Sequence, residues 1–222
     1  MGAARRDPED STACQPSRLL RDPVRLYSYK VVYDIGFAPN PFHGTCTLAT
    51  CKPKIRRGAS PGDWIVGVGS CAKRTQGRLV YAMEVEEKLT FEEYWNDPRF
   101  ERKRPNRAGS LKYRYGDNVY HRSRDGEWIQ EDCRHSLEDG SPNPAHVKRD
   151  TGADAVLVGS RFTYWGGEGP ELPAWLRDWN GVDLGEPGRD CTYKAYSPDM
   201  IEAFVGWVDG LAPGYQAPPI DW

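Results

Sequence analysis

The stretch SPGDWIVGVGS, residues 60–70, joins a turn to an apolar run and gives the clearest indication of the fold. Pro61 and Gly62 favour a turn at its start. The run WIVGVGS (64–70) has the length and composition of a buried strand, and its glycines allow another backbone to approach closely. The segment therefore predicts a buried strand of a packed sheet.

Neighbouring segments extend this sheet. LYSYKVVYDIGF (26–37) and the run from Leu79 to Val85 alternate their side chains as strands do. GTCTLATC (44–51) fits either a short strand or a turn of helix. DAVLVGSRFTYWGG (154–167) predicts one more core strand, which ends at Gly166.

Helical signals follow two of these strands. Thr90 and Glu93 have the spacing of a capping box, which predicts a helix that Pro98 ends. Residues 170–179 predict a short helix, and residues 198–211 predict a longer one with apolar side chains at helical spacing. The order of elements is that of an α+β protein. We expect a curved mixed β-sheet, or a small barrel, with peripheral helices.

The length and net charge of the chain limit the classes of protein to which it can belong. The 222 residues suffice for one good-sized core, and we expect one domain over residues 23–222 with a loop-rich basic insertion at 99–149. Residues 1–22 have no apolar signal segment and predict a flexible lead, and no stretch is apolar enough for a membrane span. We therefore expect a cytoplasmic protein. A net charge of −2 leaves local clusters to form any nucleic-acid site.

The loop after the first strand is the first candidate site. Asp34 ends that strand, and Pro39 and Pro41 hold Asn40 in an extended conformation. Asn40 can hydrogen-bond a base edge or position a water, and His43 can act as an acid, a base or a phosphate contact. We predict Asp34, Asn40 and His43 as catalytic residues. The alternative is that Asn40 caps a turn and that His43 is a solvated loop residue.

Two basic segments predict phosphate contacts. CKPKIRRG (51–58) has four cations, and residues 99–114 have seven cations against one acid, with aromatic residues between them. Such interleaving suits nucleic acid, because cations hold phosphates and rings stack on bases. We expect residues 99–114 to be exposed and to face the substrate; the alternative for both segments is a solvated loop. The predicted nucleic-acid contacts are Lys52, Lys54, Arg56, Arg57, Arg102, Lys103, Arg104, Arg107 and Arg161.

Aromatic residues predict a pocket for a flat base. Tyr164 and Trp165 follow a core strand and precede a glycine-rich loop, although a tryptophan packed at the edge of the core is an equal alternative. Six scattered cysteines include no CxxC pair, and His121, His135 and His146 have no metal-ligand spacing. We expect these histidines at the surface, and no metal or cofactor. The predicted base pocket consists of Phe37, Phe42, Trp64, Tyr164 and Trp165.

Residues 27–70 carry a family resemblance. A strand, the loop GFAPNPF, the segment CTLATCKP and the strand GDWI follow one another in this order. This order resembles the nucleotide-modification-associated domain families of bacteria and phages, in particular the second type, clearly over residues 26–100 and less clearly towards the C-terminus. The resemblance implies a link with hypermodified DNA bases and with phage conflict.

Two shorter resemblances point in related directions. SPGDWIVGVGS followed by GRLVYAMEVEEKLTFEEYW is similar to the layout of PUA-like base readers, which are small barrels. GFAPNPFHG resembles the loop after the first strand of uracil-DNA-glycosylase-like enzymes, in which an Asn or Asp positions water. The second, His-containing loop of those enzymes is not found in this sequence.

Together these observations favour a protein that recognises and processes a modified base in DNA, such as phage DNA, after the base leaves the stack. The leading hypothesis is glycosylase-type hydrolysis of the N-glycosidic bond in anti-phage defence or DNA modification. Asp34 or Asn40 would position the water. The alternatives are a PUA-like reader without chemistry and an enzyme that acts on free nucleotides. The modified base and the oligomeric state are left open.

Overall fold

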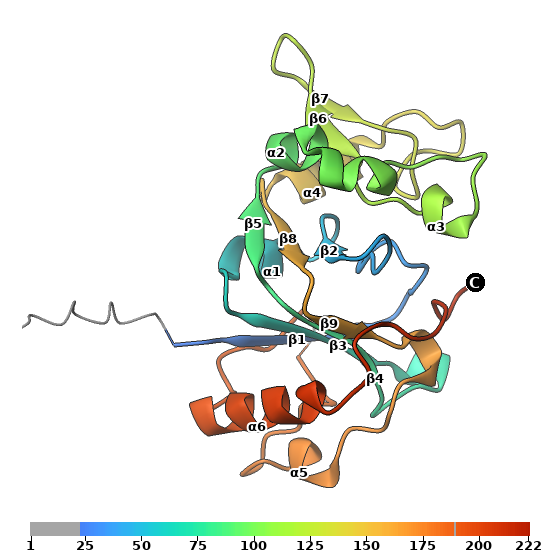
Figure 1. Ribbon diagram of the computed structural model, residues 1–222. Coiled ribbons are helices and arrows are strands. Elements are labelled where there is room, and N and C mark those ends of the chain that lie inside the picture. The colour runs from blue at the N-terminus through green and yellow to red at the C-terminus, as the bar shows by residue number, and fades with distance from the viewer. Residues whose placement is uncertain (1–22, 189) are drawn as a thin grey trace, which may run out of the picture.

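The computed structural model describes residues 23–188 and 190–222, and the lead expected at residues 1–22 lies outside them. The prediction of an α+β protein with a curved mixed sheet and peripheral helices is confirmed (Figure 1). The sheets in the described residues are open and do not close into a barrel. No helix in this part of the chain is long and apolar enough to cross a membrane.

The largest sheet has five strands. They are β1 (Leu26–Val31), β3 (Trp64–Gly69), β4 (Leu79–Glu84), β9 (Phe162–Tyr164) and β10 (Gly214–Tyr215), in the order β1-β3-β4-β9-β10. The end pairs, β1 with β3 and β9 with β10, are parallel, whereas β4 runs antiparallel to both of its neighbours. The strand predicted from residues 60–70 is therefore an inner strand. The strand predicted at 26–37 ends earlier, at Val31.

Alternating side chains bury both faces of this sheet. Leu26, Trp64 and Val66 face a core that is covered by α5 (Ala174–Arg177) and α6 (Pro198–Asp209), which lie below the sheet in Figure 1. Tyr27, Tyr29 and Ile65 are part of a second core, to which Ile55 from α1 (Pro53–Gly58) also belongs. A Cβ atom at Gly67 would lie 2.5 Å from the ring of Tyr81, so this strand position requires glycine.

A second sheet has the antiparallel order β2-β8-β5, formed by β2 (Cys46–Leu48), β8 (Val156–Gly159) and β5 (Glu87–Leu89). The strand predicted over residues 154–167 is two strands, β8 and β9, one in each sheet. At the corner between them, the carboxylate of Glu86 accepts hydrogen bonds from Ser160 N (2.7 Å), Ser160 Oγ (2.9 Å) and Arg161 N (3.3 Å). Two of the passages of the chain between the sheets therefore meet at this corner, one from β4 to β5 and one from β8 to β9.

The remaining elements form a third layer beyond the second sheet (Figure 1). They are α2 (Phe91–Asn96), a 3₁₀ helix (Pro98–Lys103), α3 (Leu111–Arg114), the hairpin of β6 (Tyr120–Arg122) and β7 (Trp128–Gln130), and α4 (Pro144–Thr151). The capping box predicted at Thr90 and Glu93 is present at the start of α2. Phe91, Phe100 and Tyr120 of this layer pack with Val156 and Val158 of β8 in a third core. Two further 3₁₀ turns, Cys71–Lys73 and Gly166–Glu168, lie in loops.

Candidate functional site

The loop between β1 and β2 carries the three predicted catalytic residues. Its end is tied back to β2, because Asn40 and Thr47 exchange two backbone hydrogen bonds of 2.9 Å. His43 has a φ of 63°, in the left-handed region, which costs a residue with a Cβ atom about 1–2 kcal/mol. The loop conformation is therefore maintained by contacts from elsewhere in the fold.

Asp34 is one of these contacts. It is 2% exposed, and both of its carboxylate oxygens accept hydrogen bonds from the hydroxyl of Tyr164, at 2.6 and 2.7 Å. The backbone N–H groups of Gly36 and Ile220 also donate to it, each at 3.3 Å. Burial raises the pKa of Asp34, although these hydrogen bonds oppose the rise. Asp34 thus joins the loop to the C-terminal segment, and it does not line the cavity next to His43.

Asn40 and Lys103 form a second buried contact. Asn40 is fully buried and donates to the carbonyls of Gly36 and Tyr115, both at 3.0 Å. Its side-chain oxygen accepts a 2.8 Å hydrogen bond from Lys103, which is itself 1% exposed. The expectation that Lys103 is exposed for phosphate contact is therefore wrong. Its ammonium group attaches the loop to the 3₁₀ helix, since it also donates to Thr45 O (3.0 Å) and Thr47 Oγ1 (3.1 Å).

His43 lines a cavity of about 460 Å³ between the loop, α3 and β10. The lining includes the rings of Phe42, Tyr113 and Tyr215 and no Asp or Glu. Lys112 lies 4.9 Å from the centroid of the Tyr215 ring, and Arg102 donates a 2.8 Å hydrogen bond to the hydroxyl of Tyr113. This cavity, called the His43 cavity below, is lined by Pro41, Phe42, His43, Gly44, Arg102, Lys112, Tyr113, Ser160, Phe162, Pro213, Gly214 and Tyr215.

The imidazole of His43 is neutral at physiological pH. Burial, followed by the nearby charges of Lys103, Arg102 and Lys112, lowers the pKa of His43 to about 4. Its Nε2 atom is buried and has no hydrogen-bond partner among the described residues. Its ring lies 5.0 Å from that of Tyr113, with 38° between the planes. The neutral imidazole therefore keeps one ring nitrogen whose hydrogen-bonding capacity no described protein group uses.

The five aromatic residues predicted as one pocket lie in different places. Only Phe42 lines the His43 cavity. Phe37 packs in the third-layer core, and Trp64 packs edge-to-face on Phe204 of α6. Tyr164 is buried and bonds to Asp34, with its ring stacked 5.8 Å from that of Tyr215. Trp165 packs against the α6 core, and its indole nitrogen is buried without a partner in the described structure.

Most of the predicted phosphate-binding cations have partners within the protein. Arg56 is fully buried and donates 2.6 Å hydrogen bonds to the carbonyls of Asp150, Ala153 and Ala155, so the expected phosphate contact by Arg56 is wrong. The exposed cations pair as follows: Lys54 with Asp190, Arg57 with Gly152 O, Arg107 with Asp132, and Arg161 with Glu84 and Asp209. The half-buried Arg104 contacts Trp95. Lys52 lies 4.3 Å from the centroid of the Tyr29 ring. Arg102 is the predicted cation that lines the His43 cavity.

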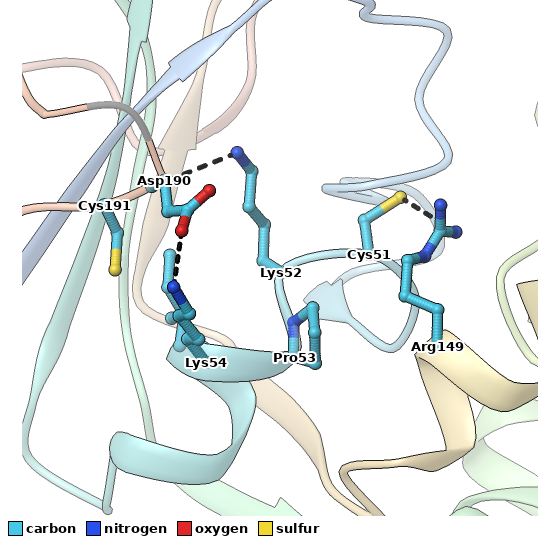
Figure 2. Close-up of a pocket in the computed structure, with 8 residues that line it drawn as sticks. Cys51, Lys52, Pro53, Lys54, Arg149, Asp190 and Cys191 are labelled. Atoms are coloured by element: carbon cyan, nitrogen blue, oxygen red, sulfur yellow. Dashed lines mark hydrogen bonds and ion pairs between the residues drawn. The ribbon is translucent and has the colours of Figure 1, made fainter.

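A second cavity, of about 410 Å³, opens at the start of α1 (Figure 2). Cys51, Arg149 and Cys191 line it, together with Lys52, Pro53, Lys54, Ile55 and Asp190. The thiol of Cys51 lies 3.5 Å from Nε2 of His135, and Nδ1 of His135 lies 2.9 Å from Oδ2 of Asp150. The prediction of a surface position is wrong for His135, which is 8% exposed. Spacing could not reveal this group, because Cys51 and His135 are 84 positions apart.

Among residues 23–188 and 190–222, no group of three or more His, Cys, Asp or Glu side chains could hold a metal ion. A protein-family model described as nucleotide modification associated domain 2 matches residues 24–222. No curated protein and no solved structure matches the chain significantly.

Proposed function

Because the chain belongs to the nucleotide modification associated domain 2 family, we propose that it recognises a modified nucleotide base in the His43 cavity. The observation that carries this proposal is the lining, in which His43 with its unpartnered Nε2 lies among four aromatic rings and two cations, without a carboxylate. Rings suit the face of a base, and cations suit the phosphate attached to it.

DNA is the proposed source of the base. Exposed cations next to the cavity, Arg102 and Lys112, could hold the phosphates on either side of an extruded nucleotide. Extrusion costs a few kcal/mol, and the cost is lower for a base that already pairs poorly. Stacking of the base on Tyr113 or Tyr215 would offset about 1–3 kcal/mol of the free energy of extrusion.

Recognition is better supported than hydrolysis of the N-glycosidic bond. That reaction needs a group that positions a water at the sugar, and the two candidates for this role were Asp34 and Asn40. Both are buried, and both already bond to protein groups behind the cavity. Of the predicted catalytic residues, His43 alone lines the cavity, where it could contact the base. An abasic-site assay on modified DNA tests for glycosylase activity, and release of a free base would reverse this preference.

Binding measurements test the proposal directly. We expect the chain to bind oligonucleotides with hydroxymethylated or glucosylated cytosine more tightly than the plain oligonucleotide. In His43→Asn, which tolerates the left-handed backbone, loss of the imidazole contact should weaken binding by about 1–3 kcal/mol. Fluorescence anisotropy at two salt concentrations measures the dissociation constant. Cytidine monophosphate carrying the same modifications tests the free-nucleotide alternative.

A matched control is His121→Asn. His121 stacks on Trp95, with ring centroids 4.0 Å apart, and does not line the His43 cavity. This variant should bind as the wild type does. Equal affinity for modified and plain DNA, with no effect of His43→Asn, would refute the proposal. Binding of the free nucleotides with no binding of DNA would assign the cavity to a nucleotide-pathway enzyme.

A further inference from the structure

Cys51 lines the second cavity, and the buried side chains of His135 and Asp150 lie behind it in the arrangement of a base and an orienting carboxylate. We propose that Cys51, His135 and Asp150 form a catalytic triad for acyl transfer, with Cys51 as the nucleophile. The inference is independent of the function proposed for the His43 cavity, because the two cavities share no lining residue.

The distances place each group where its role requires it. The thiol of Cys51 is 3.5 Å from His135 Nε2, within the range of a hydrogen bond to sulfur. The other ring nitrogen of His135 is 2.9 Å from Asp150, which is fully buried and also accepts a 3.0 Å hydrogen bond from Tyr120. Asp150 therefore orients the imidazole with its Nδ1–H towards the carboxylate and leaves Nε2 to accept the thiol proton.

The backbone at Cys51 is held in a strained conformation. Its φ of 56° lies in the left-handed region, which costs a residue with a side chain about 1–2 kcal/mol. Two contacts maintain it: Cys51 N donates to Asp150 Oδ1 at 3.1 Å, and Cys51 O accepts from Arg56 Nε at 2.8 Å. The Asp150 carboxylate thus contacts both His135 and the backbone of Cys51, and it fixes the position of the base relative to the nucleophile. Strain of this kind concentrates at active sites.

An imidazole and a guanidinium group lie next to the thiol of Cys51. Arg149 contacts both ring nitrogens of His135, at 3.3 and 3.4 Å. Its Nη2 is 4.0 Å from Cys51 Sγ, and Figure 2 marks this Arg149–Cys51 contact with a dashed line. Arg149 thus lies beside the sulfur atom that would attack the acyl carbon. Burial by itself lowers the pKa of His135, but its hydrogen bonds to Asp150 and Cys51 outweigh burial, and the pKa is raised. A raised pKa favours the imidazolium that forms when the thiol proton is transferred.

The reaction balances with water as the second substrate. His135 Nε2 takes the thiol proton, Cys51 Sγ bonds to the acyl carbon, and the carbonyl electron pair moves to oxygen. When that pair returns, the bond to the alcohol or amine breaks, and His135 donates the proton to this leaving group. A water then loses a proton to His135 and attacks the thioester. The C–S bond breaks, the proton returns to sulfur, and a carboxylic acid is released.

The lining indicates the substrate class. Three cationic side chains, Lys52, Lys54 and Arg149, line this cavity with one carboxylate, Asp190, and Figure 2 shows both lysines reaching towards Asp190. Pro53 and Ile55 add apolar surface at the same opening. The favoured substrate is therefore an ester or amide whose acyl part carries a negative charge, held by these cations while its carbonyl meets the thiol.

Alkylation by iodoacetamide, followed by mass spectrometry at pH 6.5, tests the nucleophile. Cys51 should react at least tenfold faster than Cys191, which lines the same cavity and whose thiol has a pKa raised by burial. In His135→Gln this advantage should disappear while Cys191 reacts as before. An unchanged rate at Cys51 in His135→Gln would overturn the assignment of His135 as its base.

Turnover of p-nitrophenyl acetate and of mono-p-nitrophenyl succinate tests the reaction. In the wild type we expect release of nitrophenolate with formation of an acyl group on Cys51, and faster turnover of the anionic succinate ester. Cys51→Ala should form no acyl-enzyme, and the turnover rate of His135→Gln should fall by roughly 10²–10⁴-fold. Circular dichroism establishes that both variants fold; Asp150 is left unchanged because it bonds to four groups. Nitrophenolate release that persists in folded Cys51→Ala would refute the triad.

Discussion

The ammonium group of Lys103 lies within hydrogen-bonding distance of four oxygen atoms of the loop that carries His43. Three of them belong to Asn40 and Thr47, and the fourth is the carbonyl of Thr45. Removal of a buried donor leaves its acceptors without partners, and each lost partner costs about 1–3 kcal/mol. Lys103 therefore stabilises the fold, and the shape of the His43 cavity depends on it.

Replacement of Lys103 by Met keeps the side-chain length and removes the donor. We expect Lys103→Met to lower the free energy of unfolding by about 3 kcal/mol, because several buried oxygens lose their donor. Arg107→Met, at an exposed cation of the same segment that pairs with Asp132, should change it by less than about 0.5 kcal/mol. Urea unfolding at pH 7 measures both. Equal stability of the two variants would contradict the structural role.

The same residue predicts a dependence on pH. Burial lowers the pKa of Lys103 from 10.5 to about 8. Between these values the folded chain releases a proton that the unfolded chain keeps, so this group contributes stability that rises with pH across that window. The deficit of Lys103→Met relative to the wild type should therefore grow from pH 8 to pH 10. If the difference in unfolding free energy between the wild type and Lys103→Met became smaller from pH 8 to pH 10, the folded state would favour the ammonium form of Lys103, contrary to this prediction.

At the scale of elements, the corner around Glu86 decides how the sheets meet. β4 and β5 belong to different sheets, as do β8 and β9, and the Glu86 carboxylate lies where both pairs separate. Its three hydrogen bonds go to the two residues between β8 and β9. Ser160 and Phe162 also line the His43 cavity, so the corner determines the position of one of its walls.

Glu86→Ala should lower the free energy of unfolding by about 1–2 kcal/mol, because two backbone N–H groups lose their acceptor. The matched control is Glu171→Ala, whose exposed carboxylate pairs only weakly with Arg78 at 3.4 Å. We expect little change there. Thermal unfolding followed by circular dichroism compares the two variants, and an equal effect of both would argue that the Glu86 contacts add nothing beyond surface charge.

Local signals explain which elements could be predicted. The capping box at Thr90 and the apolar spacing of α6 depend on residues three or four positions apart, and both predictions are confirmed. The split of residues 154–167 into two strands depends on Glu86, which is 74 positions from Ser160. No pattern within the segment records that contact. The charges of Arg56 and Lys103 likewise predicted exposed side chains. Both side chains are buried, because they donate hydrogen bonds to backbone carbonyls that are far away in the sequence.

At the scale of the whole molecule, the two cavities are assembled from separate parts of the chain. Residues near 42, 112, 160 and 214 meet around the His43 cavity, and residues 51, 135 and 150 meet at the second. The loop of Asn40 and His43 could be recognised from the sequence, because the prolines that restrict its backbone are direct neighbours of Asn40. Cys51 could not be singled out, because its partner histidine is 84 positions away in a segment that predicts loops.

The buried guanidinium of Arg56 connects α1 to the end of α4 through three carbonyls. One side chain thus bridges the segment that holds Cys51 and the layer that contains α4, and the two cannot separate without breaking these charge-assisted hydrogen bonds. The consequence is cooperativity. Native-state hydrogen exchange should give the amides of α4 and of the five-stranded sheet the same opening free energy. In Arg56→Met the two sets should separate, with α4 exchanging first.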